Sequence, residues 1–323
     1  MPRSPARPAA TRGPLVDVAW LRAHLTDPAV RVIDLRWYLA DKTGADEYAR
    51  GHIPGAVFVD LHHALTGPVG PGRHPIPSPA QFERAMRAAG VSPETRVVVY
   101  DDAGGSVAAR LWWLLQGHGH TKVHVLDGGF PAWVAAGGEV ETAACTVSPG
   151  RFVASLSVQL PVVDRHLVEA VRTRPGWVLL DARAAARFRG EVEPIDARPG
   201  HIPGARSAPW TDNLVDGHFA DAKALRARFR RLGVVPGATV ICYCGSGVTA
   251  CHDILALALA RISATRVKLY EGSWSDWSRD PDRPAALGDA TDPPPGRARS
   301  APSSRGRSLI LPTGAPRARG GRS

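Results

Sequence analysis

Hydrophobic and polar positions form two kinds of segment along this chain. Helical segments, with apolar side chains three or four positions apart, are predicted to begin after the capping residues Asp17, Ser78, Asp164 and Asp221. Short apolar, largely β-branched runs, such as RVVVY from Arg96, have the pattern of buried strands. Because strands and helices alternate, we predict an α/β fold in which mostly parallel sheets are flanked by helices.

This pattern occurs twice in the chain. Four blocks recur in the same order with a separation of about 145 residues, which indicates a duplicated domain. The pairs are VIDLR at 32–36 with LLDAR at 179–183, GHIPGA at 51–56 with GHIPGA at 200–205, RVVVYDD at 96–102 with TVICYCG at 239–245, and VLDGGFPAW at 125–133 with LYEGSWSDW at 269–277.

The repeats and the composition between them predict the domain boundaries. The ends of the chain are rich in Pro, Gly, Ser and Arg, which cannot bury a core, so we expect both to be disordered. The predicted parts are a leader at 1–14, a domain at 15–142, a linker at 143–160, a second domain at 161–283 and a basic tail at 284–323.

The two copies differ in the loop that follows one predicted strand. In parallel sheets, ligands bind at the carboxyl ends of strands, in the loops that lead into helices. In the second copy the strand TVICY runs into Cys244 and a glycine-rich loop, whereas the first copy has Asp101 and Asp102 there. Only the second copy therefore carries a nucleophile at this position.

The composition of this loop favours a reactive thiol at Cys244. Gly245 and Gly247 allow a tight turn in which backbone N–H groups converge on the sulfur, and the following helix directs its positive end to the same point. Such surroundings favour the thiolate, which is the reactive form of cysteine, and would also hold a persulfide. The alternative is that Cys244 is a small buried hydrophobic residue.

The neighbouring cysteines are predicted to have other roles. Cys242 alternates with Cys244 along the strand, so we expect its side chain to face the opposite side, in the core. Cys251 falls in the first turn of the next helix, where we expect packing, with a resolving role in a redox switch as the alternative. The spacing lacks the paired C-x-x-C and histidines of a structural zinc site, so no metal is expected.

The net charge of +10 comes mainly from the two ends of the chain. Three arginines lie in the leader and seven in the tail, where only two aspartates oppose them. We interpret the tail as a solvated segment with no requirement for nucleic acid, and weak contact with nucleic acid or anionic surfaces is the alternative.

No apolar run reaches the length of a membrane span, no secretory signal is present, and the few cysteines indicate a reducing compartment, so we expect a cytoplasmic protein.

The LLDAR, GHIPGA, CGSGVT and EGSWSDW blocks together resemble the tandem-domain rhodanese family, the thiosulfate and 3-mercaptopyruvate sulfurtransferases, over residues 15–283. The resemblance implies an inactive first domain and a catalytic cysteine, Cys244, in a six-residue loop of the second. It implies transfer of a sulfane sulfur from a small anionic donor through a Cys244 persulfide to cyanide or a thiol such as thioredoxin, without a cofactor. A non-catalytic sulfur carrier or binding module of rhodanese type is the alternative. The remaining loop residues are Gly245, Ser246, Gly247, Val248 and Thr249.

The resemblance also assigns roles to individual residues. Arg187, in ARFRG, resembles the arginine that binds the carboxylate or sulfonate of the donor, and a surface ion pair is the alternative. Ser246 resembles the serine that polarises the leaving sulfur or carbonyl group, and Thr249 is expected to order the loop. Asp60 and His74 match first-domain residues that reach the active site in mercaptopyruvate-type enzymes; for His74 an ordinary exposed loop position is the alternative.

The sequence departs from the mercaptopyruvate-type pattern at one point. Those enzymes carry a second arginine after an E-P-E-P stretch, whereas GEVEP is followed here by Ile195, Asp196 and Ala197. Arg198 could take its place, or the site is less selective for a keto acid. CGSGVT itself is similar to the mercaptopyruvate-type loop, so the preferred donor is left open between 3-mercaptopyruvate and thiosulfate.

Two further readings follow from the motifs. Cysteine phosphatases also place a cysteine in a glycine-rich loop before a helix, but they need an arginine six residues later, where this chain has Ala250.

The GHIPGA blocks and Arg183 have counterparts in both copies, so we expect a structural role for them, with His52 and His201 hydrogen-bonded within turns.

Overall fold

A computed structural model describes residues 13–155 and 160–289. The first domain consists of β1 (Leu15–Val16), α1 (Val18–His24), β2 (Val30–Asp34), α2 (Gly44–Arg50), β3 (Val57–Phe58), α3 (Leu61–Leu65), α4 (Pro79–Ala88), β4 (Arg96–Tyr100), α5 (Ala108–Gly117), β5 (Val123–Leu126) and α6 (Gly129–Ala135).

The second domain repeats this order with an added hairpin. It consists of β6 (Val162–Val163), α7 (Arg165–Val171), β7 (Trp177–Asp181), α8 (Ala185–Arg189), β8 (Ala205–Ser207), the 3₁₀ helix η1 (Trp210–Asn213), β9 (Leu214–Val215), β10 (His218–Phe219), α9 (Ala222–Arg231), β11 (Thr239–Tyr243), α10 (Ala250–Leu259), the 3₁₀ helix η2 (Ala264–Arg266), β12 (Val267–Tyr270) and α11 (Ser273–Trp277).

Each domain is built on a five-stranded parallel sheet. The strand orders are β1-β5-β4-β2-β3 and β6-β12-β11-β7-β8, so the two sheets have the same topology. β4 and β11 lie at the centre of their sheets, with β2 or β7 on one side and β5 or β12 on the other. Apolar side chains of both central strands are buried in the cores of their domains, as the runs RVVVY and TVICY predict. The predicted α/β fold of two tandem domains is confirmed.

The predicted helix starts are also confirmed. Asp17 and Asp164 accept hydrogen bonds from backbone N–H groups at the starts of α1 and α7, at 2.7 and 2.8 Å. Ser78 and Asp221 cap α4 and α9 in the same way. Each cap satisfies N–H groups that have no partner within the helix, which is why these short polar residues fix where the helices begin.

The GHIPGA blocks have the structural role that their presence in both copies predicts. His52 Nδ1 pairs with the carbonyl oxygen of Tyr48, and His201 Nδ1 pairs with that of Phe188, both at 2.8 Å. The preceding glycine carbonyl in each block accepts a hydrogen bond from a buried arginine, Arg36 or Arg183, at 2.7 Å. These contacts join the block to the carboxyl end of β2 or β7 in each domain.

The edges of the domains extend further than the composition indicates. Residues 143–155, assigned to the linker, lie along the first domain, where Phe152 is buried and its N–H donates to the carbonyl oxygen of Val91 at 2.9 Å. Residues 284–288, assigned to the tail, lie on the second domain, where Ala286 pairs with His201. The rest of the predicted leader, linker and tail, at 1–12, 156–159 and 290–323, falls outside the described residues.

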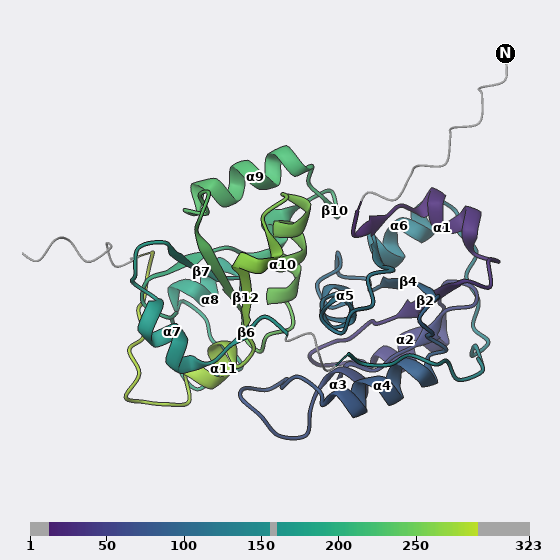
Figure 1. Cartoon of the computed structure of the whole chain (residues 1–323), viewed down its shortest axis with the longest axis horizontal. Coiled ribbons are helices and arrows are strands. Elements are labelled where there is room, and N and C mark those ends of the chain that lie inside the picture. Colours follow the sequence, from purple (N-terminus) through teal and green to yellow (C-terminus); the bar gives the residue numbers. More distant parts are fainter. Residues whose placement is uncertain (1–12, 156–159, 290–323) are drawn as a thin grey trace, which may run out of the picture.

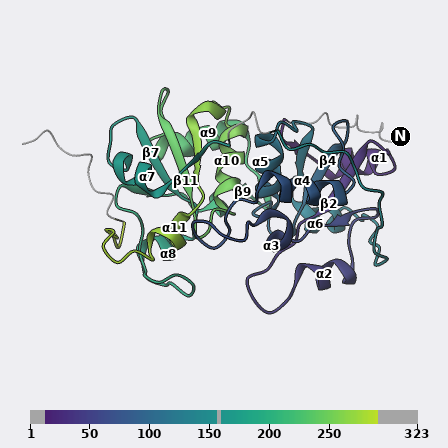
Figure 2. The ribbon, with the colours of Figure 1, turned by 60° about the horizontal axis from the view of Figure 1, so that its bottom comes forward.

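The two domains lie side by side, with α5 of the first facing α10 of the second (Figure 1 and Figure 2). Each of these helices follows the central strand of its sheet, so the loops after β4 and β11 meet at the interface. The hairpin β9–β10 adds to the contact because the N–H of Phe219 donates to Asp127 Oδ1 at 2.9 Å. Among the described residues, no helix is long and apolar enough to cross a membrane.

Candidate active site

Cys244 lies at the carboxyl end of β11, buried at the point where the strand turns into the glycine-rich loop. The N–H of Gly247 points at its sulfur, with 3.1 Å between nitrogen and Sγ. The backbone N–H of Cys244 donates to Ser273 Oγ at 3.1 Å, and its carbonyl oxygen accepts from the N–H of Trp274 at 2.9 Å. The loop thus contacts the sulfur of Cys244, while the start of α11 fixes the backbone of this residue.

Ser273 adopts a backbone conformation that is unusual for its residue type. Its φ is +54°, in the left-handed region that a side chain disfavours, and the equivalent Gly129 of the first domain has φ +58°. The turn thus needs this conformation in both copies, and the second copy uses serine because its hydroxyl accepts the N–H of Cys244. A serine that remains in a strained conformation beneath the nucleophile is a positioning residue for the loop.

The first domain shows what this loop binds when the cysteine is replaced. Asp101 occupies the position of Cys244, and its carboxylate accepts four backbone N–H groups of the following loop. Oδ1 accepts from Ala103 and Gly105, at 2.9 and 2.8 Å, and Oδ2 accepts from Val107 and Ala108, at 2.8 and 2.9 Å. The loop and the helix start after the central strand therefore form a cradle of amides that fits a buried anion.

A pocket of about 310 Å³ opens beside Cys244 between the two domains. Its second-domain lining comes from the loop, from the segment around α8 and from η1, and its first-domain lining comes from the start of α5 and two loops. The lining residues are Trp37, Leu39, Arg73, Ser106, Val107, Arg183, Ala184, Arg187, Ile195, Trp210, Cys244, Gly245, Ser246, Val248 and Thr249. The predicted loop residues and Arg187 thus meet around one cavity, with Gly247 contributing its N–H from behind.

Arg187 lines this pocket from the middle of α8. Its Nε and Nη2 donate to Glu193, and Nη2 also donates to Asp196 Oδ2 at 2.9 Å. Burial opposes ionisation of Glu193, but the hydrogen bonds from Arg187 and from backbone N–H groups lower the pKa of that carboxyl group. The side chain is only 17% exposed, so Arg187 is a fixed cation of the pocket wall and not a surface ion pair.

The first domain reaches the catalytic loop through His74 and Arg110. His74 Nδ1 lies 2.7 Å from Ser246 Oγ, a contact in which the tautomer decides which atom donates. Arg110, fully buried on α5, donates to the carbonyl oxygens of Gly247 and His74, both at 3.2 Å. His74 is therefore a buried interface residue and not an ordinary exposed loop position.

Burial keeps the His74 ring neutral. Desolvation, with smaller contributions from His62, Arg110 and Arg73, lowers the pKa of His74 to about 4. The unfolded chain takes up this proton near pH 6.5. Stability that depends on the neutral ring is therefore complete above pH 6.5 and is lost as the pH falls toward 4.

We predict that His74→Asn weakens the loss of stability in acid. Replacing the titrating ring with an amide should reduce the fall in unfolding free energy between pH 7 and pH 5 by about 2 kcal/mol. Urea unfolding at the two pH values measures this difference. His166→Asn, at an exposed histidine, is the control and should retain the full wild-type loss. A His74 variant that retains it as well would show that this ring does not titrate as described.

Two residues that the sequence connected with the site lie elsewhere. Asp60 caps α3, where Oδ1 accepts the N–H of His63 at 2.8 Å, and it does not line the pocket. Arg198, offered as a substitute for the second arginine, donates to backbone carbonyl oxygens of residues 278–283 and does not line the pocket either. Both side chains are used to stabilise local structure.

The neighbouring cysteines are buried in the core of the second domain. Cys242 is fully buried and burial raises its pKa well above the usual value. The prediction that it is a core residue is confirmed, but the prediction that it faces the opposite side of β11 from Cys244 is wrong. Side chains two positions apart in a strand lie on the same face, and Cys242, Cys244 and Cys251 belong to one buried cluster. Burial raises the pKa of Cys251 to about 12, and its sulfur packs 3.5 Å from the carbonyl oxygen of Gly247. Neither thiol is exposed for exchange. All four cysteines are unpaired, and residues 13–155 and 160–289 contain no cluster of three or more potential metal ligands.

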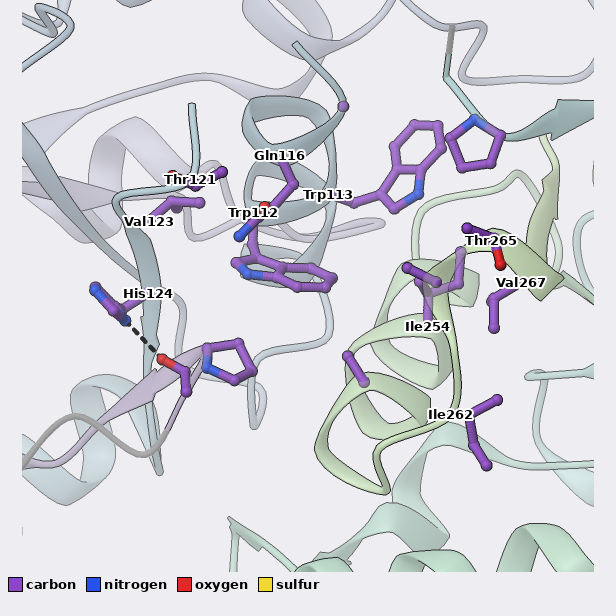
Figure 3. A pocket seen from close by; sticks show the side chains of 16 residues that line it. Trp112, Trp113, Gln116, Thr121, Val123, His124, Ile254, Ile262, Thr265 and Val267 are labelled. Carbon is purple, nitrogen blue, oxygen red and sulfur yellow. Dashed lines mark hydrogen bonds between the residues drawn. The ribbon is translucent and has the colours of Figure 1, made fainter. Parts of the chain in front are cut away.

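A second cavity, of about 690 Å³, lies at the other end of the α5–α10 pair. Figure 3 shows Trp112 and Trp113 of α5 on one side of this space and Ile254 of α10 on the other. Its lining is largely apolar and includes neither a cysteine nor a charged arginine, lysine or carboxylate side chain. Of these two cavities, the one where the two helices begin is lined by a cysteine and by arginines.

Three residues around the site were not predicted from the sequence. Arg73 precedes the noted His74 but matches no expected motif, and Arg110 is a lone charge in the apolar helix AARLWWLLQG, which is itself a signal for a buried polar role. Ser273 aligns with a glycine of the first copy, in EGS compared with DGG. A glycine at the equivalent position is a signal for backbone with positive φ.

Comparisons with known proteins agree with this geometry. The family described as rhodanese-like domain matches residues 17–136 and 165–280. A probable 3-mercaptopyruvate sulfurtransferase of Pseudomonas aeruginosa is 46% identical over 282 residues, which cover 85% of this chain and 98% of the relative. A putative thiosulfate sulfurtransferase, SseB, of Mycobacterium tuberculosis is 44% identical over 268 residues, which cover 82% and 93%.

A solved structure shows the same arrangement. The crystal structure of SseA from Escherichia coli, described as having the rhodanese fold and as a 3-mercaptopyruvate sulfotransferase, matches with a TM-score of 0.73 at 38% identity. The match covers 82% of this chain and 100% of that one.

Proposed function

Since this chain belongs to the rhodanese-like family of two-domain sulfurtransferases, we propose that it moves a sulfane sulfur from a small anionic donor to a thiophilic acceptor through a persulfide on Cys244. The observation that carries the proposal is the position of Cys244 in the loop whose first-domain equivalent holds the Asp101 carboxylate with four N–H groups, together with the N–H of Gly247 that points at the Cys244 sulfur. A cradle that holds a buried carboxylate also suits a thiolate and a persulfide anion.

The first step forms the persulfide. The Cys244 thiolate attacks the outer sulfur of thiosulfate, a sulfur–sulfur bond forms, and sulfite leaves with the electrons of the bond that breaks. With 3-mercaptopyruvate, the thiolate attacks the thiol sulfur, the carbon–sulfur bond breaks, and the enolate of pyruvate leaves and takes up a proton. The Ser246 hydroxyl, held by His74, lies in the pocket wall where it donates to the leaving group.

The second step returns the cysteine. An acceptor attacks the outer sulfur of the persulfide, so cyanide leaves as thiocyanate and a thiol leaves as its own persulfide, while Cys244 becomes a thiolate again. The sulfur is covalently bound throughout, which is why the reaction as written requires no cofactor. Thioredoxin or another cellular thiol remains the predicted acceptor, and the cytoplasm remains the predicted location.

We predict that Arg187→Ala mainly raises the KM for anionic donors. Loss of a charge-assisted hydrogen bond of about 1.5–3 kcal/mol corresponds to roughly a tenfold to hundredfold increase, with a smaller effect on kcat. Steady-state kinetics with thiosulfate and cyanide measure both constants. Arg189→Ala is the matched control, because Arg189 pairs with the more exposed Glu191 and does not line the pocket. An unchanged KM in the Arg187 variant would remove this residue from the donor site.

One comparison tests the function and the donor together. We would measure kcat/KM for thiosulfate and for 3-mercaptopyruvate with cyanide as the acceptor, over many turnovers. One relative is named for 3-mercaptopyruvate and the other for thiosulfate. The ratio of the two kcat/KM values therefore shows which donor this chain prefers. A single turnover that stops with sulfur on the protein would favour the carrier alternative. No turnover with either donor would contradict the proposal.

A further inference from the structure

A loop of the first domain is fixed on the wall of the Cys244 pocket. Gly72 has φ +73°, and a Cβ at this position would lie 2.4 Å from the carbonyl oxygen of Gly272, so the loop approaches the second domain too closely for a side chain. The next residue, Arg73, donates its backbone N–H to Ser275 Oγ at 3.1 Å. His74 then contacts Ser246. The backbone at Arg73 is therefore held in place from both sides.

The side chain of Arg73 continues into the pocket and meets Arg187 there. Arg73 Nη1 pairs with Asp196 Oδ1, while Arg187 Nη2 pairs with Asp196 Oδ2. A Cβ placed on Gly245, next to the nucleophile, would lie 2.9 Å from Arg73 Nη2 and 3.5 Å from Arg187 Nη1. Asp196 thus lies between two guanidinium groups whose other ends both face the catalytic loop.

These facing nitrogen atoms are available for a ligand. The hydrogen bonds of Arg73 and Arg187 within residues 13–155 and 160–289 use Arg73 N and Nη1, and Arg187 N, Nε and Nη2, and leave Arg73 Nη2 and Arg187 Nη1 for the pocket. Both residues line the pocket with Cys244. Asp196 is 2% exposed, so it is covered by the two arginines and does not compete from the pocket side.

We propose that Arg73, although it belongs to the domain without the nucleophile, binds the anionic group of the sulfur donor together with Arg187. Two parallel sets of N–H donors suit the oxygen atoms of a carboxylate or a sulfonate. Asp196 holds the two cations at a fixed separation and reduces their mutual repulsion. The neighbouring Ile195 also lines the pocket but is apolar, so the second cation of the site comes from across the domain interface. The identity of the anion rests on the proposed function.

A pair of alkylating reagents tests this role without requiring sulfur transfer. Iodoacetate and iodoacetamide both react with a cysteine thiolate and release iodide, but only iodoacetate is an anion. Peptide mass spectrometry of Cys244 gives the rate of each reaction. The iodoacetate rate divided by the iodoacetamide rate increases with the positive charge in the pocket. We expect Arg73→Ala to lower the iodoacetate-to-iodoacetamide ratio about tenfold and Arg73→Lys to retain most of it.

Two further variants make the result specific. Ile195→Arg in the Arg73→Ala background should restore the ratio, because it returns a cation to the pocket from the other domain. Arg50→Ala removes a charge of the first domain that is 69% exposed and outside the pocket, and it should leave the ratio unchanged. A ratio within twofold of wild type in Arg73→Ala, or an equal fall in Arg50→Ala, would overturn the inference.

Steady-state kinetics separate donor binding from an interface role. Arg73→Ala should raise the KM for thiosulfate about tenfold with little change in kcat. Equal slowing of both alkylating reagents, or a fall in kcat at unchanged KM, would mean that Arg73 only holds the domains together, and would overturn the inference. If the wild type transferred no sulfur at all, the proposed function would fail, while the alkylation ratio would still decide whether Arg73 binds anions.

Discussion

Replacing Cys244 with serine is expected to abolish thiocyanate formation from every donor, with a fall in kcat on the order of 10⁴-fold or more. A serine hydroxyl is not ionised at neutral pH and cannot form the persulfide that both half-reactions share. The substitution changes one atom at a buried position, so the fold should remain intact. Initial rates with thiosulfate and with 3-mercaptopyruvate, each with cyanide, measure the loss.

Mass spectrometry gives an independent reading of the same prediction. The wild-type protein should gain the mass of one sulfur atom after treatment with a donor, on the peptide that contains Cys244, and should lose it on addition of cyanide. Cys145→Ser is the matched control, because Cys145 is a partly exposed thiol outside the pocket. Activity that survives Cys244→Ser, or a sulfur adduct that maps to Cys145, would contradict the mechanism.

The second large effect is expected in the domain that has no nucleophile. Asp101→Asn replaces one carboxylate oxygen with an NH₂ group, which must then face two of the four backbone N–H groups that now donate to Asp101. Leaving buried donors without an acceptor should lower the unfolding free energy by about 3 kcal/mol. Hydrogen exchange of the amides of residues 103–108, with urea unfolding, measures the change.

Asp102→Asn is the control for this substitution. Asp102 is adjacent and only partly buried, and it accepts a hydrogen bond from the hydroxyl of Tyr38, which an amide oxygen can also accept. We expect a change below about 1 kcal/mol there. Faster exchange in both variants, or in neither, would show that the cradle around Asp101 is not a special source of stability.

The sequence predicted those parts of the site that are local in the chain. Cys244 follows a buried strand, is followed by Gly245 and Gly247, and precedes a helix, all within a short stretch of the chain. The fold was equally accessible because the duplicated blocks and the helix caps are short local patterns. Arg187 also carried a recognisable motif, although the sequence did not show that it pairs with Glu193 and Asp196.

The parts that it missed depend on contacts between distant residues. Arg73 and Asp196 are separated by 123 positions, and Arg110 and Gly247 by 137, so no local pattern connects them. For Asp60 the motif was present, but the side chain is used as a helix cap, and a cap and a ligand-binding carboxylate look alike in sequence. Arg198 is a similar case, since proximity in sequence to Ile195 did not bring it into the pocket.

The contacts of His74 and Arg110 across the interface have a consequence for dissecting the protein. A fragment that starts at residue 160 would expose the carbonyl oxygen of Gly247 and the hydroxyl of Ser246 to water and would lose one wall of the pocket. Such a truncated chain would retain Cys244, but water would have access to its sulfur. The first domain lacks the nucleophile but is therefore required for turnover, and its loss should lower kcat as much as a substitution beside Cys244.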